Sequence, residues 1–487
     1  MNEKDYSSLV SKVWNYAHVL RDQGISYGDY VEQITYLLFL KMDEERSALL
    51  GEPSIIPKKW RWEQLANKDG DALELQYRHT LEALGSQPGL IGTIFRKAQN
   101  KLTDPAKLTR VVSLIAKEGP WIGIGVDVKG RIYEGLLEKN AAEVKSGAGQ
   151  YFTPRPIIEA MVQCINPKIK ETVSDPACGT GGFLLAAYNH MKGQSQDREL
   201  LRKLRDGALT GIDIVDEVVR LCAMNLYLHG IGNGASPVKQ GDALSADPGE
   251  RFDIILTNPP FGKKSSYKVV GEDGQVSTER ENYEREDFKF TTSNKQFNFL
   301  QHVMTILDTN GRTGIVLPDN VLFEAGRAGE GIRKRLLEQF DFHTLIRLPT
   351  GIWYSQGVKA NVLFFDKKPA AKEPWTKKLW IYDFRTNMHF TLKTKTLKKE
   401  DLVDFVKCYN PKNRNKRKET ERFKCFTYEE LIKRDKLNLD IFWLKDDSLE
   451  DIENLPAPDV IAGEIVENLQ AALEQFQSVA EELEKDE

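Results

Sequence analysis

A hydrophobic run that stops at two consecutive prolines is the feature that most constrains how this chain can fold. Residues 252–256 read Phe-Asp-Ile-Ile-Leu, and after Thr257 the chain continues as Asn258-Pro259-Pro260-Phe261. Adjacent prolines can continue neither a strand ladder nor a helix, so the run is predicted to be a strand that ends in a stiff, extended turn. Open α/β sheets bind their ligands at the carboxyl ends of such strands. We therefore expect a functional site at this turn.

The residue types of this turn suit the binding of an amino group on a planar ring. The Asn258 side-chain oxygen and the Pro259 carbonyl can both accept hydrogen bonds from an exocyclic amine, and Phe261 can lie flat on a purine. The plain alternative is a strand-to-loop turn in which the asparagine is incidental. The segments that precede the turn favour the functional interpretation.

A glycine turn follows the first predicted strand, 171–174. It runs from Asp175 to Phe183 and reads Asp-Pro-Ala-Cys-Gly-Thr-Gly-Gly-Phe, and a helix is predicted to begin after it. Glycines let the backbone approach a ligand where a side chain would block it. The turn is neither the dinucleotide GxGxxG nor a phosphate-binding GK[ST] motif. It favours a nucleoside with a small zwitterionic tail over a pyrophosphate cofactor, and Cys178 within it is interpreted as a packing residue.

Acidic residues end the next two predicted strands. The run 208–213 ends in Asp213, and the run 238–244 contains Asp242. A carboxylate in the first position can accept hydrogen bonds from ribose hydroxyls, and one in the second from an adenine amine. Either residue alone is more often a turn or helix cap. The glycine turn, two acids and the Asn-Pro-Pro-Phe turn, each after a successive strand, together favour a nucleoside site.

Strands and helices continue to alternate as far as residue 365, which predicts an α/β fold with seven strands in one sheet and intervening helices. Residues 5–141 have helical periodicity instead and are interpreted as a domain for interaction. Between the two, segment 147–156 breaks the pattern. Thr153 is predicted to cap a helix that begins at Pro154, and its free N–H groups could hold a carboxylate. The alternative is a domain-linking loop with a capped helix and no ligand.

Three further segments carry separate predictions. Residues 262–293 are expected to form a mobile loop that either closes over DNA or is simply solvated, and the basic run 412–424 either contacts phosphates or is a solvated loop. The terminal segment 458–487 is predicted to be a helix with a heptad seam for a partner helix, or one that packs on its own domain. One more strand is expected at 379–383. The predicted domains are 1–141 (helical), 142–370 (catalytic), 371–457 (extension) and 458–487 (terminal helix).

Composition excludes several classes of protein. Hydrophobic residues make up 40% and charged residues 29% of the 487 residues, and no apolar run is long enough for a membrane span. Five scattered cysteines without a CxxC pair predict neither a disulfide scaffold nor a metal site, and we expect a cytoplasmic protein. The net charge of -4 is less basic than expected for a protein that binds duplex DNA unaided.

Three motifs in this order resemble the amino-methylating DNA methyltransferases of gamma motif order. They are Gln150-Tyr151-Phe152-Thr153-Pro154-Arg155, the turn from Asp175 to Phe183, and Asn258-Pro259-Pro260-Phe261. The whole layout is similar to the modification (M) subunit of a type I restriction-modification system, over nearly the full chain. The resemblance implies a Rossmann-like S-adenosylmethionine-dependent methyltransferase sheet, with an N-terminal helical domain and a C-terminal helical tail. It also implies methyl transfer from S-adenosyl-L-methionine to N6 of adenine in duplex DNA.

The resemblance assigns roles to individual residues. The catalytic residues implied are Asn258, Pro259, Pro260 and Phe261. The cofactor-binding residues implied are Gln150, Tyr151, Phe152, Thr153, Pro154, Arg155, Asp175, Gly179, Thr180, Gly181, Gly182, Asp213 and Asp242. Many relatives carry glutamate where this chain has Asp213, so Asp216 is a second, weaker candidate for the ribose contact.

The chemistry and the partners follow from these assignments. Acceptors at Asn258 and Pro259 would draw the adenine amine toward tetrahedral geometry and stabilise its developing positive charge, with the extruded base stacked on Phe261. No separate module for reading base edges follows the last strand. We therefore expect a specificity subunit with two copies of this chain, and a restriction and translocation subunit could join them. The alternatives are a stand-alone DNA, RNA or protein-amide methyltransferase, and a non-catalytic cofactor-binding scaffold of a defence complex.

Overall fold

The helical N-terminal region is confirmed for the residues that the structure describes. This computed structural model describes residues 27–51, 53–117, 121, 153–232, 235–261, 266–270, 276–280, 283–353, 358–392 and 394–445. The helices of this region are α2 (Tyr27–Leu50), α3 (Trp62–Ala66), α4 (Gly70–Gly85), α5 (Gly89–Phe95) and α6 (Pro105–Lys117). Their apolar sides form one core around the fully buried Trp62, Tyr77 and Phe95. The helix expected before residue 27 and the boundary at 141 lie outside the described residues.

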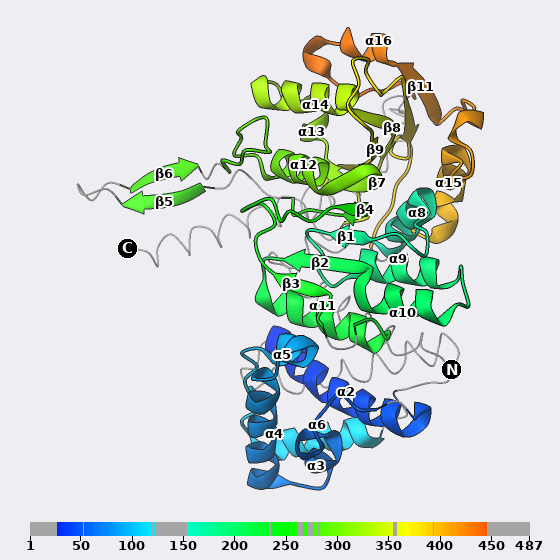
Figure 1. The fold of residues 1–487 in the computed structure, drawn as a ribbon. Coiled ribbons are helices and arrows are strands. Elements are labelled where there is room, and N and C mark those ends of the chain that lie inside the picture. Colours follow the sequence, from blue (N-terminus) through cyan, green and yellow to red (C-terminus); the bar gives the residue numbers. More distant parts are fainter. Residues whose placement is uncertain are drawn as a thin grey trace, which may run out of the picture.

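The remainder is built on a nine-stranded mixed sheet (Figure 1), in the order β11-β10-β8-β9-β7-β4-β1-β2-β3. Its strands are β1 (Val173–Asp175), β2 (Leu209–Asp213), β3 (Val238–Gln240), β4 (Phe252–Thr257), β7 (Leu307–Pro318), β8 (Phe340–Arg347), β9 (Ala360–Lys367), β10 (Lys378–Asp383) and β11 (Phe423–Thr427). Strands β3, β2, β1, β4 and β7 run parallel, whereas β9 is antiparallel to both of its neighbours.

The strand order reverses between β1 and β4. β1 pairs with β2 on one side and with β4 on the other, and Val173 lies opposite both Leu209 and Ile254. The connections that leave β1 and β4 therefore diverge at the carboxyl edge of the sheet. Such a reversal opens the crevice in which α/β sheets bind ligands. The glycine turn and the Asn-Pro-Pro-Phe turn leave the sheet at this point.

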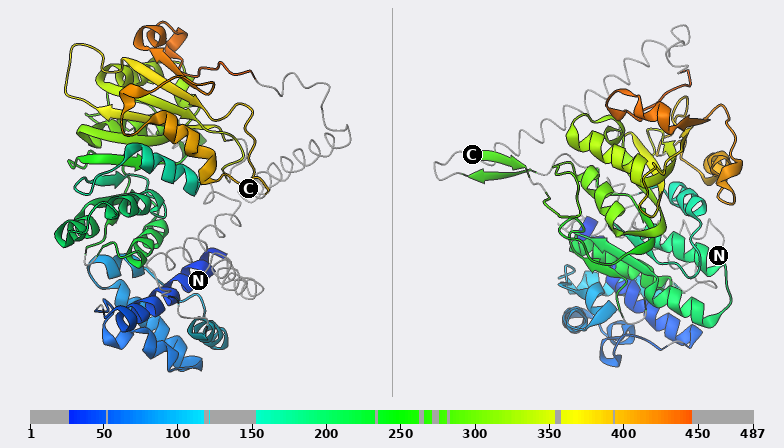
Figure 2. Two further views of the ribbon diagram at one scale, coloured as in Figure 1. Left: turned by 90° about the vertical axis from the view of Figure 1, so that its right-hand side faces the viewer. Right: turned by 45° about the horizontal axis from the view of Figure 1, so that its top comes forward.

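Helices cover both faces of the sheet. On one face pack α8 (Arg155–Ile165), α9 (Gly182–Lys192), α11 (Asp216–Leu228) and α15 (Val403–Tyr409), and on the other α12 (Lys295–Ile306) and α14 (Arg327–Gln339). The alternation of a strand explains this: Ile254 and Leu256 belong to the first core and Ile255 to the second. The short or peripheral helices are α10 (Arg198–Gly207), α13 (Asn320–Phe323) and α16 (Tyr428–Ile432). Two turned views show the helical region beneath this layered body (Figure 2).

The prediction of seven strands in the sheet was wrong. All seven are present, but β10, predicted as a separate strand, and β11, which was not predicted, join the same sheet. β10 pairs parallel with β8, and β11 pairs antiparallel with β10 from Lys378 opposite Thr427 to Tyr382 opposite Phe423. These strands belong to the segment 371–457 that was assigned to an extension. The domain boundaries themselves stay a prediction, and the terminal segment 458–487 lies outside the described residues.

Segment 262–293, expected to be a mobile loop, is not an irregular loop throughout its described parts. Strands β5 (Ser266–Val270) and β6 (Val276–Arg280) form a two-stranded antiparallel hairpin, which projects from the body in Figure 1. Beyond it, the chain packs back against the sheet edge, with Phe288 and Ser293 buried. Phe288 contacts a small core formed with Ala243, Leu244 and Phe299. The aromatic residues of this returning polar segment, Tyr283, Phe288 and Phe290, are too few to give a periodicity from which this packing could be predicted.

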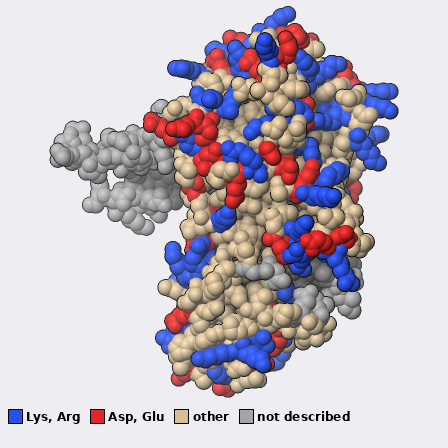
Figure 3. All heavy atoms as spheres, in the orientation of Figure 1, with Lys and Arg blue, Asp and Glu red and all other residues tan. Residues whose placement is uncertain are grey.

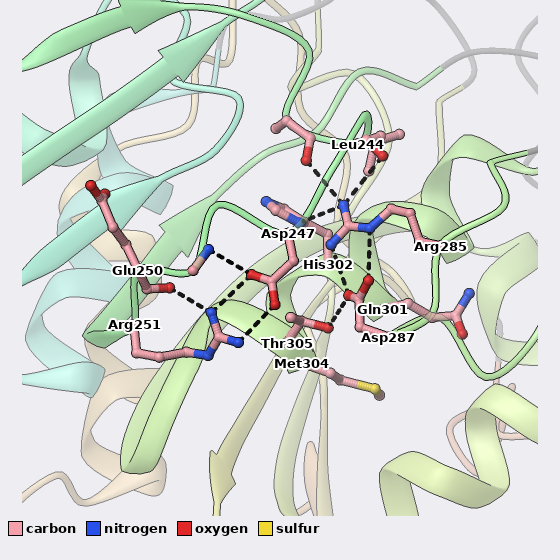
Figure 4. A network of polar contacts seen from close by, with 12 residues as sticks. Leu244, Asp247, Glu250, Arg251, Arg285, Asp287, Gln301, His302, Met304 and Thr305 are labelled. Atoms are coloured by element: carbon pink, nitrogen blue, oxygen red, sulfur yellow. Dashed lines mark hydrogen bonds and ion pairs between the residues drawn. The ribbon is translucent and has the colours of Figure 1, made fainter.

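Arg285 ties this returning segment to the loop after β3 (Figure 4). Its guanidinium donates to the carbonyl oxygens of Ala243 and Leu244, each at 3.2 Å, and forms an ion pair with Asp287 at 2.7 Å. Burial lowers the pKa of His302 to about 3, so its imidazole is neutral and Nδ1 can accept from Arg285 at 3.1 Å. The residues that follow Asp242 are thus fixed by a segment about forty positions later, which pairwise sequence patterns do not reveal.

The basic run 412–424 neither forms a solvated loop throughout nor offers all its charges to phosphates. The Arg414 guanidinium pairs with Asp366, and Arg417 is buried and donates to the carbonyls of Tyr409 and His343. Arg422 donates to the carbonyls of Asp383 and Thr386. These three arginines link the outer strands to their neighbours through carboxylate and carbonyl acceptors.

The surface carries charges of both signs. On the face drawn in Figure 3, basic and acidic side chains are interspersed rather than gathered into one basic field, as the net charge of -4 suggests. Among the described helices, none combines the length and the apolar character that crossing a bilayer requires.

Candidate active site

Asn258 lies at the carboxyl end of β4, and of the two polar atoms in its side-chain amide the nitrogen is hydrogen-bonded and the oxygen has no partner among the described residues. Its side chain is buried, and Nδ2 donates to Thr153 Oγ1 at 2.8 Å. Oδ1 is also buried, and no donor contacts it within the described structure. Since a buried carbonyl oxygen without a partner is rare in folded proteins, this atom is a candidate acceptor for a ligand amine. The held Nδ2 fixes the direction in which that oxygen points.

Thr153 does not cap the following helix, as the sequence had predicted. The N-cap of α8 is Pro154, and no side chain bonds to the first free N–H groups of the helix. The Thr153 hydroxyl instead accepts from Asn258, a residue 105 positions later. Thr153 therefore joins the start of α8 to the turn after β4, which places it in the site for a different reason from the one predicted.

The rest of the turn is fixed by its neighbours. Pro259 is buried, and the Pro260 carbonyl accepts from Gln296 Nε2 at 3.4 Å, at the start of α12. The Phe261 ring meets Trp353 edge to face, with ring centres 5.6 Å apart and an interplanar angle of 77°. Trp353 is 3% exposed, and its indole Nε1 has no acceptor within the described structure. Phe261 therefore packs against a buried tryptophan whose indole N–H has no acceptor among the described residues.

The glycine turn is anchored on both sides. Asp175, at the end of β1, accepts through Oδ1 from Thr257 Oγ1 at 2.6 Å and from the Ala177 backbone N–H at 3.1 Å. Burial raises the pKa of Asp175 to about 7. On the far side, Asn225 Nδ2 of α11 donates to the Thr180 carbonyl at 2.8 Å, and its buried Oδ1 has no donor within the described structure.

The two later acids lie over the neighbouring strands. Asp213 accepts from the backbone N–H of Gly179 at 3.1 Å and of Val215 at 2.9 Å, and burial raises its pKa. Asp242 accepts from the Leu244 N–H at 2.9 Å and from the Tyr283 hydroxyl at 3.1 Å. Each acid thus has a defined orientation at the same edge of the sheet. Beside Asp213, the Ile214 side chain is 62% exposed and offers an apolar surface.

Asp216 is not a second candidate for the same duty. Its carboxylate forms ion pairs with Arg96 of the helical region and with Arg220 one turn further along α11. A carboxylate already shared between two guanidinium groups has little left to offer a sugar hydroxyl. Asp213 stays the predicted ribose acid.

A cavity of about 250 Å³ is lined by half of the described candidates. Those that line it are Thr153, Arg155, Asp175, Gly179, Thr180, Gly182 and Asn258. It continues between α8 and α9, where Lys399 and Arg155 both approach the Glu159 carboxylate, at 3.0 and 3.6 Å. Asp213 and Asp242 do not line this cavity and lie further along the sheet edge. Gln150, Tyr151 and Phe152 lie outside the described residues.

Two families of known proteins match the chain. The N-6 DNA Methylase family matches residues 125–446, and the HsdM N-terminal domain matches residues 9–115. The type I restriction enzyme StySPI methylase subunit of Salmonella potsdam is 36% identical, with 99% of this chain and 96% of that protein covered. This chain belongs to the methylase subunits of type I restriction enzymes.

Other members of this family agree with the fold as well as the sequence. The EcoKI methylase subunit of Escherichia coli K12 is also 36% identical, again over 99% of this chain and 96% of its own. A solved chain from a type I R-M system is 28% identical and superimposes with a TM-score of 0.70, covering 99% of both chains. The similarity therefore includes the helical region, the sheet and the segments that follow it. The resemblance to modification subunits is confirmed.

Several site residues of this methylase subunit could not be found from its sequence. Asn225 was the easiest of them to suspect from the sequence, because it is a polar residue among the mostly apolar buried residues of α11. Trp353 and Gln296 lie in segments between predicted strands, and only their contacts with Phe261 and Pro260 reveal them. No spacing rule connects such residues to a turn 35 to 95 positions away, so the fold is needed to identify them.

Proposed function

We propose that this type I methylase subunit transfers a methyl group from S-adenosyl-L-methionine to N6 of an adenine extruded from duplex DNA, at the Asn258 turn. One observation carries the proposal. Asn258 Oδ1 is a buried acceptor without a partner, held in direction by Thr153 and placed beside the glycine turn. An amine with two N–H groups is the ligand that such an acceptor suits.

The described residues fit the proposed cofactor. A methyl group added at Gly179 would meet no atom within 4 Å, so the turn borders open space there. The neighbouring glycines are closed in, because a Cβ on Gly181 would lie 2.8 Å from Cys222 Sγ and one on Gly182 would lie 2.9 Å from Ile158. An added methyl group would thus point into open space at Gly179 and against protein side chains at the other two glycines. The bound cofactor would supply an electrophilic methyl group on a sulfonium.

The residues of the chain would hold the reacting amine. Asn258 Oδ1 and the Pro259 carbonyl would each accept a hydrogen bond from one of its two N–H groups, which localises the nitrogen lone pair and stabilises the positive charge that develops. Thr153 keeps the amide from turning its nitrogen toward the base. Phe261, supported from behind by the buried Trp353, would provide the aromatic surface against which an extruded base stacks. Orientation of the amine is the main contribution, because the leaving group is already good.

The edge of the sheet would bind the cofactor in three parts. Asp175 and the glycine turn lie nearest Asn258 and suit the cationic methionine end. Asp213 would accept from the ribose hydroxyls, and the exposed Ile214 would contact the flat adenine. Asp242, kept in place by Tyr283, would accept from the adenine amine. Gln150 to Arg155, part of which lies beyond the described residues, is proposed to complete this pocket.

The proposed partners are duplex DNA and a specificity subunit that binds two copies of this chain, and a restriction and translocation subunit could join them. The mixed surface charge supports the requirement for a partner subunit, because the chain shows no extended basic surface on the drawn face for binding duplex DNA by itself. The deciding assay measures methyl transfer from labelled S-adenosyl-L-methionine to unmodified plasmid DNA, with and without the specificity partner, and identifies the product base by mass spectrometry. We expect N6-methyladenine only with the partner. Product from the chain alone would contradict the proposal that a specificity subunit recognises the DNA sequence. A different product base would contradict the proposed reaction.

The raised pKa of Asp175 predicts a proton released on cofactor binding. With a pKa of about 7, this carboxyl is mostly protonated at pH 6 in the free protein. A cationic ligand beside it favours the carboxylate, so binding lowers the pKa and a proton leaves. The affinity should therefore rise with pH up to about 7 and then level off. Titration calorimetry at pH 6 in buffers of different ionisation enthalpy measures the released proton directly.

The matched control is Asp175→Asn. Both hydrogen bonds to Asp175 end on Oδ1, so an amide oxygen can accept them unchanged. The variant should bind without the buffer-dependent enthalpy. An equal proton release from both proteins would assign the ionisation to another group.

A further inference from the structure

Helix α11 lies between the sheet and the N-terminal helical region (Figure 1). Val219, Cys222 and Leu226 belong to the core on the sheet. Leu221, Met224 and Tyr227 on the same helix belong to the core of the helical region. A helix that is apolar on both sides transmits a displacement from one layer to the next, because neither interface can slide without opening the other.

The first turn of α11 is fixed by charges from the helical region. Arg96, just after α5, forms an ion pair with Asp216, and Glu32 of α2 forms one with Arg220. Arg220 also pairs with Asp216 at 2.9 Å and donates to the Arg96 carbonyl at 3.3 Å. The Glu32, Arg220 and Asp216 side chains are 12%, 11% and 17% exposed, so solvent screens the pairs of Arg220 only partly, whereas Arg96 is 37% exposed and its pair is screened more.

The same helix touches the proposed cofactor site at two places. Asp213, whose carboxylate bonds to the Gly179 and Val215 N–H groups, is three residues before Asp216. Two turns further along α11, Asn225 holds the Thr180 carbonyl of the glycine turn. The direction of α11 therefore sets the relative position of the ribose acid and the glycine turn.

We propose that Arg96 and Arg220 are positioning residues for the cofactor site, through which docking of the helical region and cofactor binding favour each other. This inference rests on the cofactor assigned under the proposed function. Linkage requires the effect to be reciprocal: if docking tightens binding, binding must tighten docking by the same factor. The helical region is then part of the cofactor site's support as well as an interaction domain.

The test compares cofactor affinity across the interface by titration calorimetry on the full chain. Arg96→Met keeps the aliphatic stem and removes the charge, and we expect S-adenosyl-L-methionine to bind about 5- to 20-fold more weakly. Arg96→Lys should recover part of the loss. The control is Tyr227→Phe, which removes a 2.8 Å hydrogen bond to Asp43 across the same interface but leaves the first turn of α11 intact. Its affinity should fall less than that of Arg96→Met, because the charged side chains on the first turn of α11 stay paired.

A second readout measures the reciprocal effect. Adding the cofactor should slow amide hydrogen exchange in α2 and α5 of the unaltered chain, and should slow it less in Arg96→Met. If Arg96→Met does not fold, Glu32→Gln takes its place, because it breaks the pair with Arg220 from the other side. Equal affinity of the unaltered chain and of the charge-removing variant for S-adenosyl-L-methionine overturns the inference. Failure of the unaltered chain to bind the cofactor at all overturns the proposed function instead, so the two failures are distinguishable.

Discussion

Replacing Asn258 with alanine is expected to lower the rate of methyl transfer by about 10²- to 10³-fold, which is the usual loss when one preorganised hydrogen-bonding group is removed from a reacting centre. The substitution deletes the buried Oδ1 acceptor and leaves the glycine turn, Asp175 and Asp213 in place. Cofactor affinity should therefore stay unchanged while the rate falls. Single-turnover methyl transfer, measured in the complete complex with saturating cofactor and DNA, separates the two quantities.

Three further variants show whether the acceptor itself is responsible. Asn258→Asp keeps an oxygen in the same place and should retain more activity than Asn258→Ala. Thr153→Val is nearly isosteric but leaves Asn258 Nδ2 unheld, so we expect an intermediate loss. Asn298→Ala is the matched control, since Asn298 is also buried, has Nδ2 held by the Thr292 carbonyl and has an unpaired Oδ1. It should reduce stability without a specific loss of rate. An Asn258→Ala protein with near-normal turnover would support a non-catalytic scaffold.

The edge of the sheet that carries the candidate site was predictable from sequence because its signals are local. Each strand end is marked by the residues that follow it, namely Asp175 and the glycines, Asp213, Asp242 and the Asn-Pro-Pro-Phe turn. Backbone direction alone brings the ends of parallel strands to one edge. The strands β1, β2, β3 and β4 are present and adjacent, as that reasoning requires.

The errors concern residues whose roles depend on partners far along the chain. Arg414 and Arg417 are read from sequence as part of a basic run, yet Asp366 and the His343 carbonyl, 48 and 74 positions earlier, accept their hydrogen bonds. Asp216 had the right charge and nearly the right place for the ribose, but its ion pair with Arg96 spans 120 positions. Charge composition predicts how many such groups a segment has. It does not predict which groups the fold neutralises.

The glycine turn offers the second large expected effect. Gly179→Ala should weaken binding of S-adenosyl-L-methionine by about 5- to 150-fold, the equivalent of about 1–3 kcal/mol of overpacking against a ligand. Gly179 has a φ of +52°, and its added methyl group would contact no protein atom within 4 Å. The free protein therefore experiences only the backbone strain of a left-handed alanine, about 1–2 kcal/mol. The methyl group obstructs only what binds beside the turn.

Gly230→Ala is the control that separates strain from obstruction. Gly230 follows α11, has a φ of +77°, and its added methyl group would also meet no atom within 4 Å. Both substitutions should lower the free energy of unfolding by a similar amount, measured by chemical denaturation. Only Gly179→Ala should lower the affinity for the cofactor, measured by calorimetry. Gly181→Ala should instead impair folding, because its Cβ would lie 2.8 Å from Cys222 Sγ. If Gly179→Ala bound the cofactor as tightly as Gly230→Ala, the ligand would not lie against this turn, and the cavity between α8 and α9 would need another occupant.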